Sequence, residues 1–480
     1  MLASLKASEG TALNQIIPSG NLNSLIIKNE QIIPSLTNDK KYFFRSLNYL
    51  GSKLRMLDII GEVIDELSSP NDVVVDLFAG SGSVSRFLSQ SRTVISADIQ
   101  EYSRVICSAI LNPSNSIQPE EIVERCRSSS MHAALTASCA EVILYEEEAI
   151  SRALQGLPLQ LCEFLEEGSF IKSADENYRN CTGLLERALK ASYQKLMELE
   201  GRREGSCTAT LYYGGIYFSF KQTAAIDAIL YEIENSDIRD RDTLLAALLS
   251  AVSSAVNTIG KQFAQPIQPR MANGQPKKGI AVKVKKDREI DIFEVFLENL
   301  QRYVELNSSG LPHQALCMDY SEALDQLPKD TRVVYADPPY TRDHYSRFYH
   351  VLETLCLRDS PTVSRTKIGG SLRLSRGLYR EQRHQSPFCI RSQAPKAFTT
   401  LFDKVSKLGA SLVLSYSPHV VREGEHPRVM TIEDLTALAR NHFQNIYTVY
   451  PGEFKHNKLN SRENSFEQKP HGEILIVCKN

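Results

Sequence analysis

The sequence predicts an α/β protein in which one parallel sheet is interrupted by a large, mostly helical insertion. Three observations predict this fold class. Short β-branched runs alternate with helical stretches near the start, the same alternation resumes beyond Leu311, and the residues between have almost only helical spacing. Neither flank alone has enough strands to bury two sheet faces, so we expect both flanks to form one sheet.

The elements follow from this pattern in chain order. Residues 41–111 are the expected first part of the catalytic domain, with buried parallel strands at 73–77 and 93–96. Residues 112–312 are the expected insertion, which would recognise the target, with helices within 120–150, 183–199, 223–234 and 243–256 and a strand pair at 211–213 and 216–218. Residues 313–480 are the expected second part, with strands at 332–335, 411–415, 445–450 and 473–477. Residues 1–40 form an extension without an assigned role.

Composition describes a globular chain that buries a core. The 480 residues are 42% hydrophobic, and 55 Lys and Arg against 57 Asp and Glu give a net charge of −2. Taken whole, this balance argues against a protein that coats nucleic acid or membrane. The uncharged run 243–260 contains the polar residues Ser250, Ser253, Ser254, Asn257 and Thr258 besides its first residue Thr243, so a buried helix is favoured over a membrane span. The ten cysteines include no Cys-x-x-Cys pair, and we expect a cytoplasmic protein with neither a metal nor a membrane partner.

A glycine-rich turn follows the first strand, in the segment Asp76-Leu77-Phe78-Ala79-Gly80-Ser81-Gly82-Ser83. Glycines let the backbone pass close to a ligand, and the next helix offers free N–H groups. The second strand ends at Asp98, where a carboxylate would meet a ribose diol. The turn lacks the third glycine of the dinucleotide fingerprint. Together with Asp98, the turn fits a cofactor that contains a nucleoside. A purely structural turn is the alternative, and Asp76 is either a ligand group or a cap.

The motif Asp337-Pro338-Pro339-Tyr340 follows an apolar strand. Adjacent prolines lack N–H donors and belong just past the strand end, where open α/β sheets bind ligands. Such a site suits methylation of an exocyclic amine, because Asp337 and the Pro338 carbonyl would accept the two hydrogens of an adenine amine and localise its lone pair. Tyr340 offers a face for stacking a base taken out of a duplex. The alternative is a rigid surface turn with a capping Asp.

These motifs, with Asn48–Lys53 before them and Asp319-Tyr320 between them, resemble the Dam-like family of DNA adenine-N6 methyltransferases. All four segments occur in the family's order, and Asp319 stands 18 residues before Asp337. The resemblance covers roughly the first and last thirds of the chain. It implies a Rossmann-like S-adenosylmethionine-dependent methyltransferase sheet. It also implies the activity of a site-specific DNA-methyltransferase (adenine-specific) that uses S-adenosyl-L-methionine.

The resemblance further implies a role for each motif residue. Lys53 would pair with the carboxylate of the cofactor's methionine, Asp98 would bind its ribose hydroxyls, and Asp319 would accept from its adenine amine. The target base would lie against Asp337, Pro338, Pro339 and Tyr340, and the methyl group would pass to it by direct displacement. The cofactor-binding residues expected in all are Tyr49, Lys53, Asp76, Phe78, Gly80, Gly82, Asp98, Asp319 and Tyr320.

Two basic stretches predict DNA contacts. Residues 261–288 carry eight Lys or Arg against one Asp, and residues 358–396 carry nine against two acidic residues. Amide side chains accompany the first stretch, whose Gly and Pro residues predict a flexible loop without helix. Solvated surface charge is the alternative interpretation. The residues expected to bind DNA are Lys261, Gln262, Arg270, Lys277, Lys278, Arg376, Arg380 and Arg383.

The helix expected after the second motif carries Tyr345, Phe348, Tyr349, Leu352 and Leu355 at helical spacing, which we interpret as its core face. Double-stranded DNA is the expected partner, together with a cognate restriction endonuclease if the protein serves restriction–modification. Two alternatives stay open: a cytosine-N4 or RNA-base amino-methyltransferase, and a catalytically silent DNA-binding relative. The sequence does not reveal the recognition site or the oligomeric state.

Overall fold

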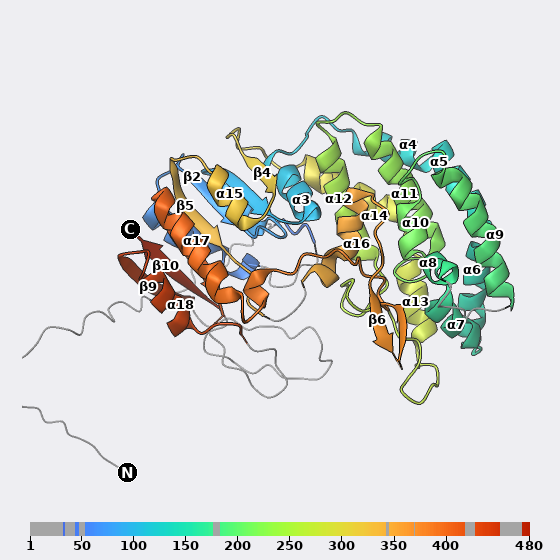
Figure 1. Ribbon diagram of the computed structural model, residues 1–480. Helices are drawn as coiled ribbons and strands as arrows, with labels where there is room; N and C mark the ends of the chain where they lie inside the picture. Colours follow the sequence, from blue (N-terminus) through green and yellow to red (C-terminus); the bar gives the residue numbers. More distant parts are fainter. Residues whose placement is uncertain are drawn as a thin grey trace, which may run out of the picture.

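The computed structural model describes residues 32–33, 44–47, 53–175, 183–341, 345–368, 370–417, 428–451 and 473–480. A sheet covered by helices on both faces makes up one half of the molecule, and a helical body makes up the other (Figure 1). Strands from both flanks of the insertion lie in the same sheet. The predicted fold class, a Rossmann-like α/β sheet with a large helical insertion, is confirmed.

The main sheet has the strand order β9-β10-β8-β5-β2-β3-β4, with the two-residue β1 beside β9. All neighbours are parallel except β10, which runs antiparallel to both β8 and β9. The two halves of the chain meet where β2 pairs with β5. The strands are β1 Ile32–Ile33, β2 Val73–Leu77, β3 Thr93–Asp98, β4 Gln314–Cys317, β5 Thr331–Ala336, β8 Ser411–Tyr416, β9 Asn445–Pro451 and β10 Ile474–Lys479.

Alternate strand residues enter two different hydrophobic cores. On β2, Val74 packs with the helices of one face and Val75 with those of the other, as the two-residue period of a strand requires. Because both faces are covered, the strands are nearly continuous apolar runs, which is why the sequence predicts them. One face is covered by α15 Tyr320–Gln326, α17 Ala394–Leu408 and α18 Ile432–Ala439, and the other by α1 Leu57–Leu67, α2 Ser83–Leu88, α3 Glu101–Leu111 and α16 Ser346–Leu357.

The insertion is helical, and α12 and α14 continue the core beneath α3 and α16. Its uncharged run forms the buried helix α12, as predicted. In the part of the chain that the structure describes, no helix is both long and apolar enough to cross a membrane. The helices are α4 Pro119–Arg127, α5 Ser130–Ser138, α6 Ala140–Leu154, α7 Leu159–Glu167, α8 Phe170–Ala174, α9 Gly183–Glu200, α10 Thr208–Tyr213, α11 Phe220–Glu234, α12 Arg241–Ala255, α13 Ile280–Arg288 and α14 Ile292–Val304.

The predicted strand pair at 211–213 and 216–218 is wrong. Residues 208–213 form α10 instead, and only an isolated bridge joins Gly214 to Phe218. The cause is a tertiary contact: the buried carboxylate of Asp227, on α11, accepts from the backbone N–H groups of Ala209 and Thr210 at 2.8 Å each. These contacts satisfy the first N–H groups of α10 and override the β preference of its tyrosines.

Two further differences concern the basic stretches. The prediction that residues 261–288 lack a helix is wrong, because α13 follows the left-handed Gly279 and buries Ile280, Ala281 and Val284. Residues 358–396 contain a hairpin, β6 Arg365–Ile368 paired with β7 Ser371–Leu374, and a short 3-10 helix, η2 Pro387–Cys389. The sequence pattern indicated neither element.

Candidate active site

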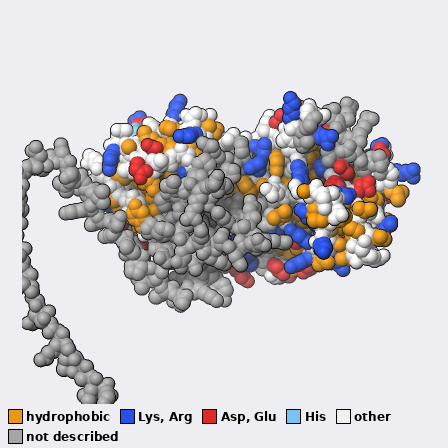
Figure 2. All heavy atoms as spheres, turned by 90° about the horizontal axis from the view of Figure 1, so that it is seen from below, with side chains coloured by type: hydrophobic (Ala, Val, Ile, Leu, Met, Phe, Trp, Pro, Cys, Tyr) orange, Lys and Arg blue, Asp and Glu red, His pale blue; other side chains and the backbone are white. Residues whose placement is uncertain are grey.

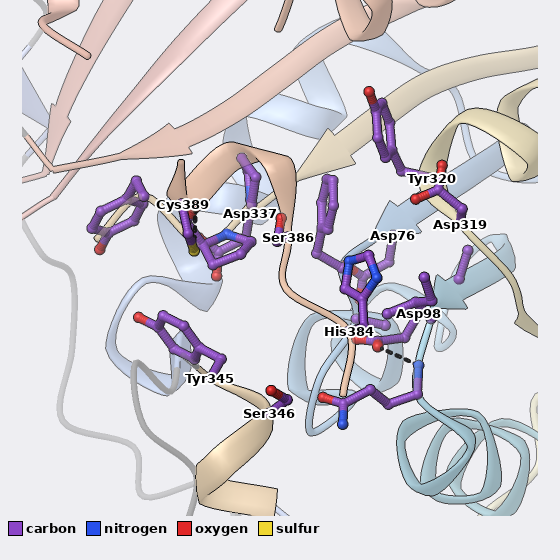
Figure 3. Close-up of a pocket in the computed structure, with 18 of the residues that line it drawn as sticks. Asp76, Asp98, Asp319, Tyr320, Asp337, Tyr345, Ser346, His384, Ser386 and Cys389 are labelled. Atoms are coloured by element: carbon purple, nitrogen blue, oxygen red, sulfur yellow. Dashed lines mark hydrogen bonds between the residues drawn. The ribbon is translucent and has the colours of Figure 1, made fainter. Parts of the chain in front are cut away.

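One pocket lies where the parallel strands β2, β3, β4 and β5 end (Figure 3). Because these strands run in the same direction, the loops that follow them meet at one edge of the sheet. Phe78, Asp98, Asp319 and Asp337 line the pocket, one at or just after the end of each strand. The predicted residues that also line it are Lys53, Asp76, Tyr320, Pro338, Pro339 and Tyr340, whereas Tyr49 lies outside the described residues.

Left-handed backbone shapes the turn after β2. Phe78, Gly80 and Gly82 have φ angles of 64°, 54° and 71°. A Cβ atom on Gly82 would lie 2.3 Å from Cδ1 of Ile110, so the turn packs against α3 only with glycine there. The N–H of Gly80 donates to Oδ2 of Asp98 at 3.0 Å, which joins the turn to the end of β3. Gly80 and Gly82 do not line the pocket themselves; their backbone shapes the turn whose residues Phe78, Ala79, Ser81 and Ser83 line it.

The rings of Phe78 and Tyr320 form one wall of the pocket, and Phe388, which is fully buried, packs behind them. The ring centroid of Phe78 lies 5.7 Å from that of Tyr320 and 5.3 Å from that of Phe388. Tyr320 and Phe388 are 4.9 Å apart, edge to face. Such a wall suits the face of a purine ring, because aromatic rings pack well against one another.

The acidic residues near this aromatic wall differ in their hydrogen bonds and in their burial. Asp98 also accepts from the N–H of Gln100 at 3.0 Å, and burial raises its pKa. Asp319 caps α15 by accepting from the N–H of Ser321 at 2.9 Å. Asp76 is buried and accepts from Oγ of Ser85 at 2.6 Å, and burial raises its pKa to about 7. Carboxylate oxygens keep further lone pairs, so Asp98 and Asp319 can still accept from the hydroxyl and amine groups of a nucleoside.

The other half of the pocket centres on Lys53, in the 3-10 helix η1 Lys53–Arg55. Its Nζ atom lies 2.6 Å from Oδ2 of Asp337 and 2.8 Å from Oε1 of Glu473, the residue before β10. Tyr340 donates its hydroxyl to the same Oε1 atom at 3.0 Å. Lys53 is 7% exposed and Asp337 is 21% exposed, so the carboxylate is the more open to the pocket.

Burial and charge set the protonation of this group. Burial raises the pKa of Asp337 to about 6; Lys53 opposes this effect and Glu473 adds to it. Burial alone would lower the pKa of Lys53, but Asp337 and Glu473 more than offset it, and the pKa stays well above its ordinary value. The ammonium of Lys53 thus pairs with two carboxylates of the protein. The sequence predicted a contact with the cofactor's carboxylate and gave no sign of these two partners.

Tyrosines line the pocket near the proline motif. One face of the Tyr340 ring carries the guanidinium of Arg428 at 4.9 Å, and the Tyr416 ring lies 5.0 Å away. Tyr345 also lines the pocket (Figure 3), although its spacing predicted a core position. Tyr349 is buried on the same helix, as predicted. Tyr345 could have been predicted as a pocket residue from its position five residues after Tyr340, at the start of α16.

Sequence reasoning missed several other residues. Glu473 belongs to no motif, and His384, Ser386 and Cys389 reach the pocket from the second basic stretch. The thiol of Cys389 donates to the Pro339 carbonyl at 3.5 Å, which ties the proline motif to η2. Among the described residues, no group of three His, Cys, Asp or Glu side chains is placed to hold a metal ion.

The structure places part of the predicted DNA-binding set in internal contacts. Lys261 donates to the carboxylate of Asp287 at 2.9 Å, Gln262 is 9% exposed, and Arg270 pairs with Glu166 at 3.1 Å. Arg380 is buried and pairs with Asp359 at 2.5 Å. These side chains stabilise the helical body.

Other members of the set reach the surface. Lys278 and Arg376 are exposed, and Lys277 and Arg383 are half-buried. Many Lys and Arg side chains lie on the surface of the helical half of the molecule when it is seen from below (Figure 2). Arg383 stacks over Tyr379 at 5.1 Å, and its Nε and Nη1 atoms have no hydrogen-bond partner within the described ranges.

Tyr217 joins the two basic stretches. Its hydroxyl lies 2.5 Å from the Phe263 carbonyl in the first stretch and 2.9 Å from the Gly377 carbonyl in the second. The hydroxyl of Tyr379 donates to the Ala264 carbonyl. His350, on α16, packs against both tyrosine rings. The tyrosine-rich segment 212–218 therefore fixes both stretches relative to the helix that follows the proline motif.

Comparison with known proteins agrees with this geometry. Residues 49–143 and 284–406 match the model of the family described as D12 class N6 adenine-specific DNA methyltransferase. The chain is similar to this family over these two segments. The two matched segments contain the glycine-rich turn and the proline motif, and most of the helical insertion lies between them.

The chain is also similar to the curated protein modification methylase LlaI of Lactococcus lactis subsp. lactis. The two are 23% identical over 434 residues, which is 90% of this chain and 55% of the relative. The chain thus spans about half the length of the curated relative it matches.

Proposed function

We propose that the protein transfers a methyl group from S-adenosyl-L-methionine to the N6 atom of an adenine flipped out of double-stranded DNA, at one short recognition sequence. The observation that carries this proposal is the shared pocket: Asp337, Pro338 and Tyr340 lie in the same cavity as Phe78, Asp98 and Asp319. The cytoplasm, where chromosomal DNA lies, is the proposed place of action.

The residues of the first half fit the cofactor. The rings of Phe78 and Tyr320 suit its adenine, and the carboxylates of Asp98 and Asp319 suit its ribose hydroxyls and its amine. When bound, S-adenosylmethionine supplies a methyl group on a positively charged sulfur; the carbon–sulfur bond breaks, and both of its electrons stay on the sulfur.

The residues of the second half prepare the amine. Asp337 and the Pro338 carbonyl accept hydrogen bonds from the two N6 hydrogens. The nitrogen lone pair therefore no longer delocalises into the ring, and it forms the new N–C bond. Positive charge moves onto the base as the bond forms, and the carboxylate of Asp337 stabilises it. The surplus N6 proton leaves by way of this carboxylate to water. Tyr345 and Tyr340 lie where a flipped base would stack.

Expression in a bacterial host that lacks DNA methylation tests the proposal. Single-molecule sequencing of the host DNA should show N6-methyladenine in one short motif. Digestion and mass analysis would identify N4-methylcytosine if the amine were that of cytosine. Unmodified DNA from cells that contain the folded protein would contradict the proposal. Expression beside a neighbouring endonuclease gene would test the further proposal that the protein protects DNA in a restriction–modification system, as the name of the LlaI methylase suggests for that relative.

The rate of methyl transfer should depend on pH through Asp337. Only the carboxylate accepts both hydrogens well, and its pKa is raised to about 6. We therefore expect the single-turnover rate to rise with pH up to about 6 and then to level off. The same shift has the opposite sign for stability: the folded protein binds this proton more tightly than the unfolded chain, so this contribution to folding is lost as the pH rises through 6. Rapid-quench measurements with saturating DNA and cofactor check the rate, and a flat profile between pH 5 and pH 7, roughly one unit on either side of this pKa, would contradict the assignment.

Arg383 should contribute to DNA affinity. Burial lowers its pKa, the nearby charge of Arg347 adds to this effect, and a phosphate placed between the two would satisfy their buried N–H groups. We expect Arg383→Ala to weaken binding of all DNA sequences similarly and to reduce the salt dependence by about one ion. Fluorescence anisotropy over a range of salt concentrations measures this. Arg380→Ala is the matched control, since it breaks an internal pair and should lower stability without changing the salt dependence.

A further inference from the structure

Glu473 occupies a position that no motif accounts for. It stands directly before β10, which lies between β8 and β9, and it is 8% exposed. One of its oxygens, Oε1, lies 2.8 Å from Nζ of Lys53 and accepts from the hydroxyl of Tyr340 at 3.0 Å. Lys53 in turn lies 2.6 Å from Asp337. A continuous chain of contacts therefore joins the first and the last residue of the proline motif through Lys53 and Glu473.

The charges of this chain bear on the reaction. Asp337 and Lys53 alone would sum to zero, and the ammonium would compete with the adenine amine for the Asp337 oxygens. With Glu473 the group carries one net negative charge. The carboxylate of Glu473 offsets the positive charge of Lys53 close to the base, where further positive charge develops during the reaction. It also accepts some of the hydrogen bonds that Lys53 would otherwise donate to Asp337.

We propose that Glu473 is a positioning residue for methyl transfer: it draws Lys53 partly away from Asp337, fixes the Tyr340 ring, and leaves the target site with a net negative charge. This role rests on the proposed function. Glu473 acts through Lys53 and Tyr340, both of which it contacts directly.

Several charged or titratable groups surround Asp337 and must be held constant in the test. They come from every element packed around it: Lys53 on η1, Asp76 on β2, Tyr335 on β5, Tyr340 in the same loop, and Glu473 before β10. A Gln at position 473 keeps the side-chain shape and removes only one charge, so it changes the fewest of these groups.

The test compares Glu473→Gln with the unsubstituted protein in single-turnover methyl transfer to DNA from a methylation-free host. We expect the plateau rate to fall about tenfold to a hundredfold, less than the loss typical when a direct electrostatic partner is removed. We also expect the acid limb of the pH profile to move down by about one unit, because a nearby like charge is lost. Cofactor binding, measured by calorimetry, should be unchanged.

Glu353→Gln is the matched control. This carboxylate is also partly buried, but it accepts from the backbone N–H groups of Glu101 and Tyr102, outside the proline motif. It should leave the pH profile unchanged. An unchanged rate and an unchanged pH profile in Glu473→Gln would overturn the inference while the unsubstituted protein still methylates DNA, so failure here differs from failure of the proposed function.

A second measurement needs no activity. Chemical unfolding of Glu473→Gln, Tyr340→Phe and the double variant forms a cycle that reports whether the two side chains act together. Non-additive losses of stability would support the proposed network, and strictly additive losses would overturn it.

Discussion

Asp337→Asn is expected to lower the rate of methyl transfer by about a hundredfold to a thousandfold, the range found when a preorganised electrostatic partner is removed. Asn has the shape of Asp, but it has no negative charge to stabilise the positive charge that develops on the base. The ammonium of Lys53 would also lose one of its two carboxylate partners. Single-turnover assays with labelled cofactor measure this loss directly.

Binding measurements show whether the loss lies in the chemical step. Calorimetry should find cofactor binding unchanged, because Asp98, Asp319 and the aromatic wall are intact in Asp337→Asn. Asp325→Asn is the control: this exposed residue on α15 pairs with Lys404 and should leave the rate unchanged. A variant Asp337→Asn that keeps the full rate would show that the proline motif does not hold the target amine.

Arg288→Ala is expected to cause the largest loss of stability, about 3–5 kcal/mol, because it leaves a buried carboxylate without its charged partner. Arg288 and Glu146 are 1% and 3% exposed, and their Nη1 and Oε1 atoms lie 2.5 Å apart. Arg288 also donates to the Gly215 carbonyl at 2.7 Å and to Oδ1 of Asn257 at 3.3 Å. Urea unfolding followed by circular dichroism measures the loss.

The same helix supplies a matched control for Arg288. Lys286 is exposed on α13, so Lys286→Ala should change the free energy of unfolding by no more than about 0.5 kcal/mol. Because Arg288 lies within the basic stretch 261–288, a surface role would predict the opposite result: unchanged stability and weaker DNA binding. That result would contradict the buried ion pair.

The sheet was predictable because of its burial on both faces. Strands such as Val73–Leu77 and Ser411–Tyr416 are mostly apolar, and this local property is visible without knowledge of their neighbours. The short edge strand β4 has no such signature, since Gln314 and Cys317 are exposed. The position of the proline motif and the glycine turn at one sheet edge follows from the parallel arrangement, which the alternation of strands and helices already indicated.

What the sequence could not indicate depends on contacts between distant residues. The helix α10 forms because Asp227 accepts hydrogen bonds from its first backbone N–H groups. No local sequence pattern predicts that contact. In the basic stretches, a count of charges does not separate Arg380, which pairs with Asp359, from the exposed Arg376. Glu473 has no motif, and its importance arises only when β10 brings it to Lys53.

The place of β10 has a consequence for synthesis of the protein on the ribosome. Lys53 emerges early, and Glu473 emerges after every residue that lines the pocket. Until β10 has been made, β8 and β9 lack the strand that lies between them, and the proline motif lacks its carboxylate support. A nascent chain can fold its glycine turn and its helical body, but it cannot complete the target side of the pocket.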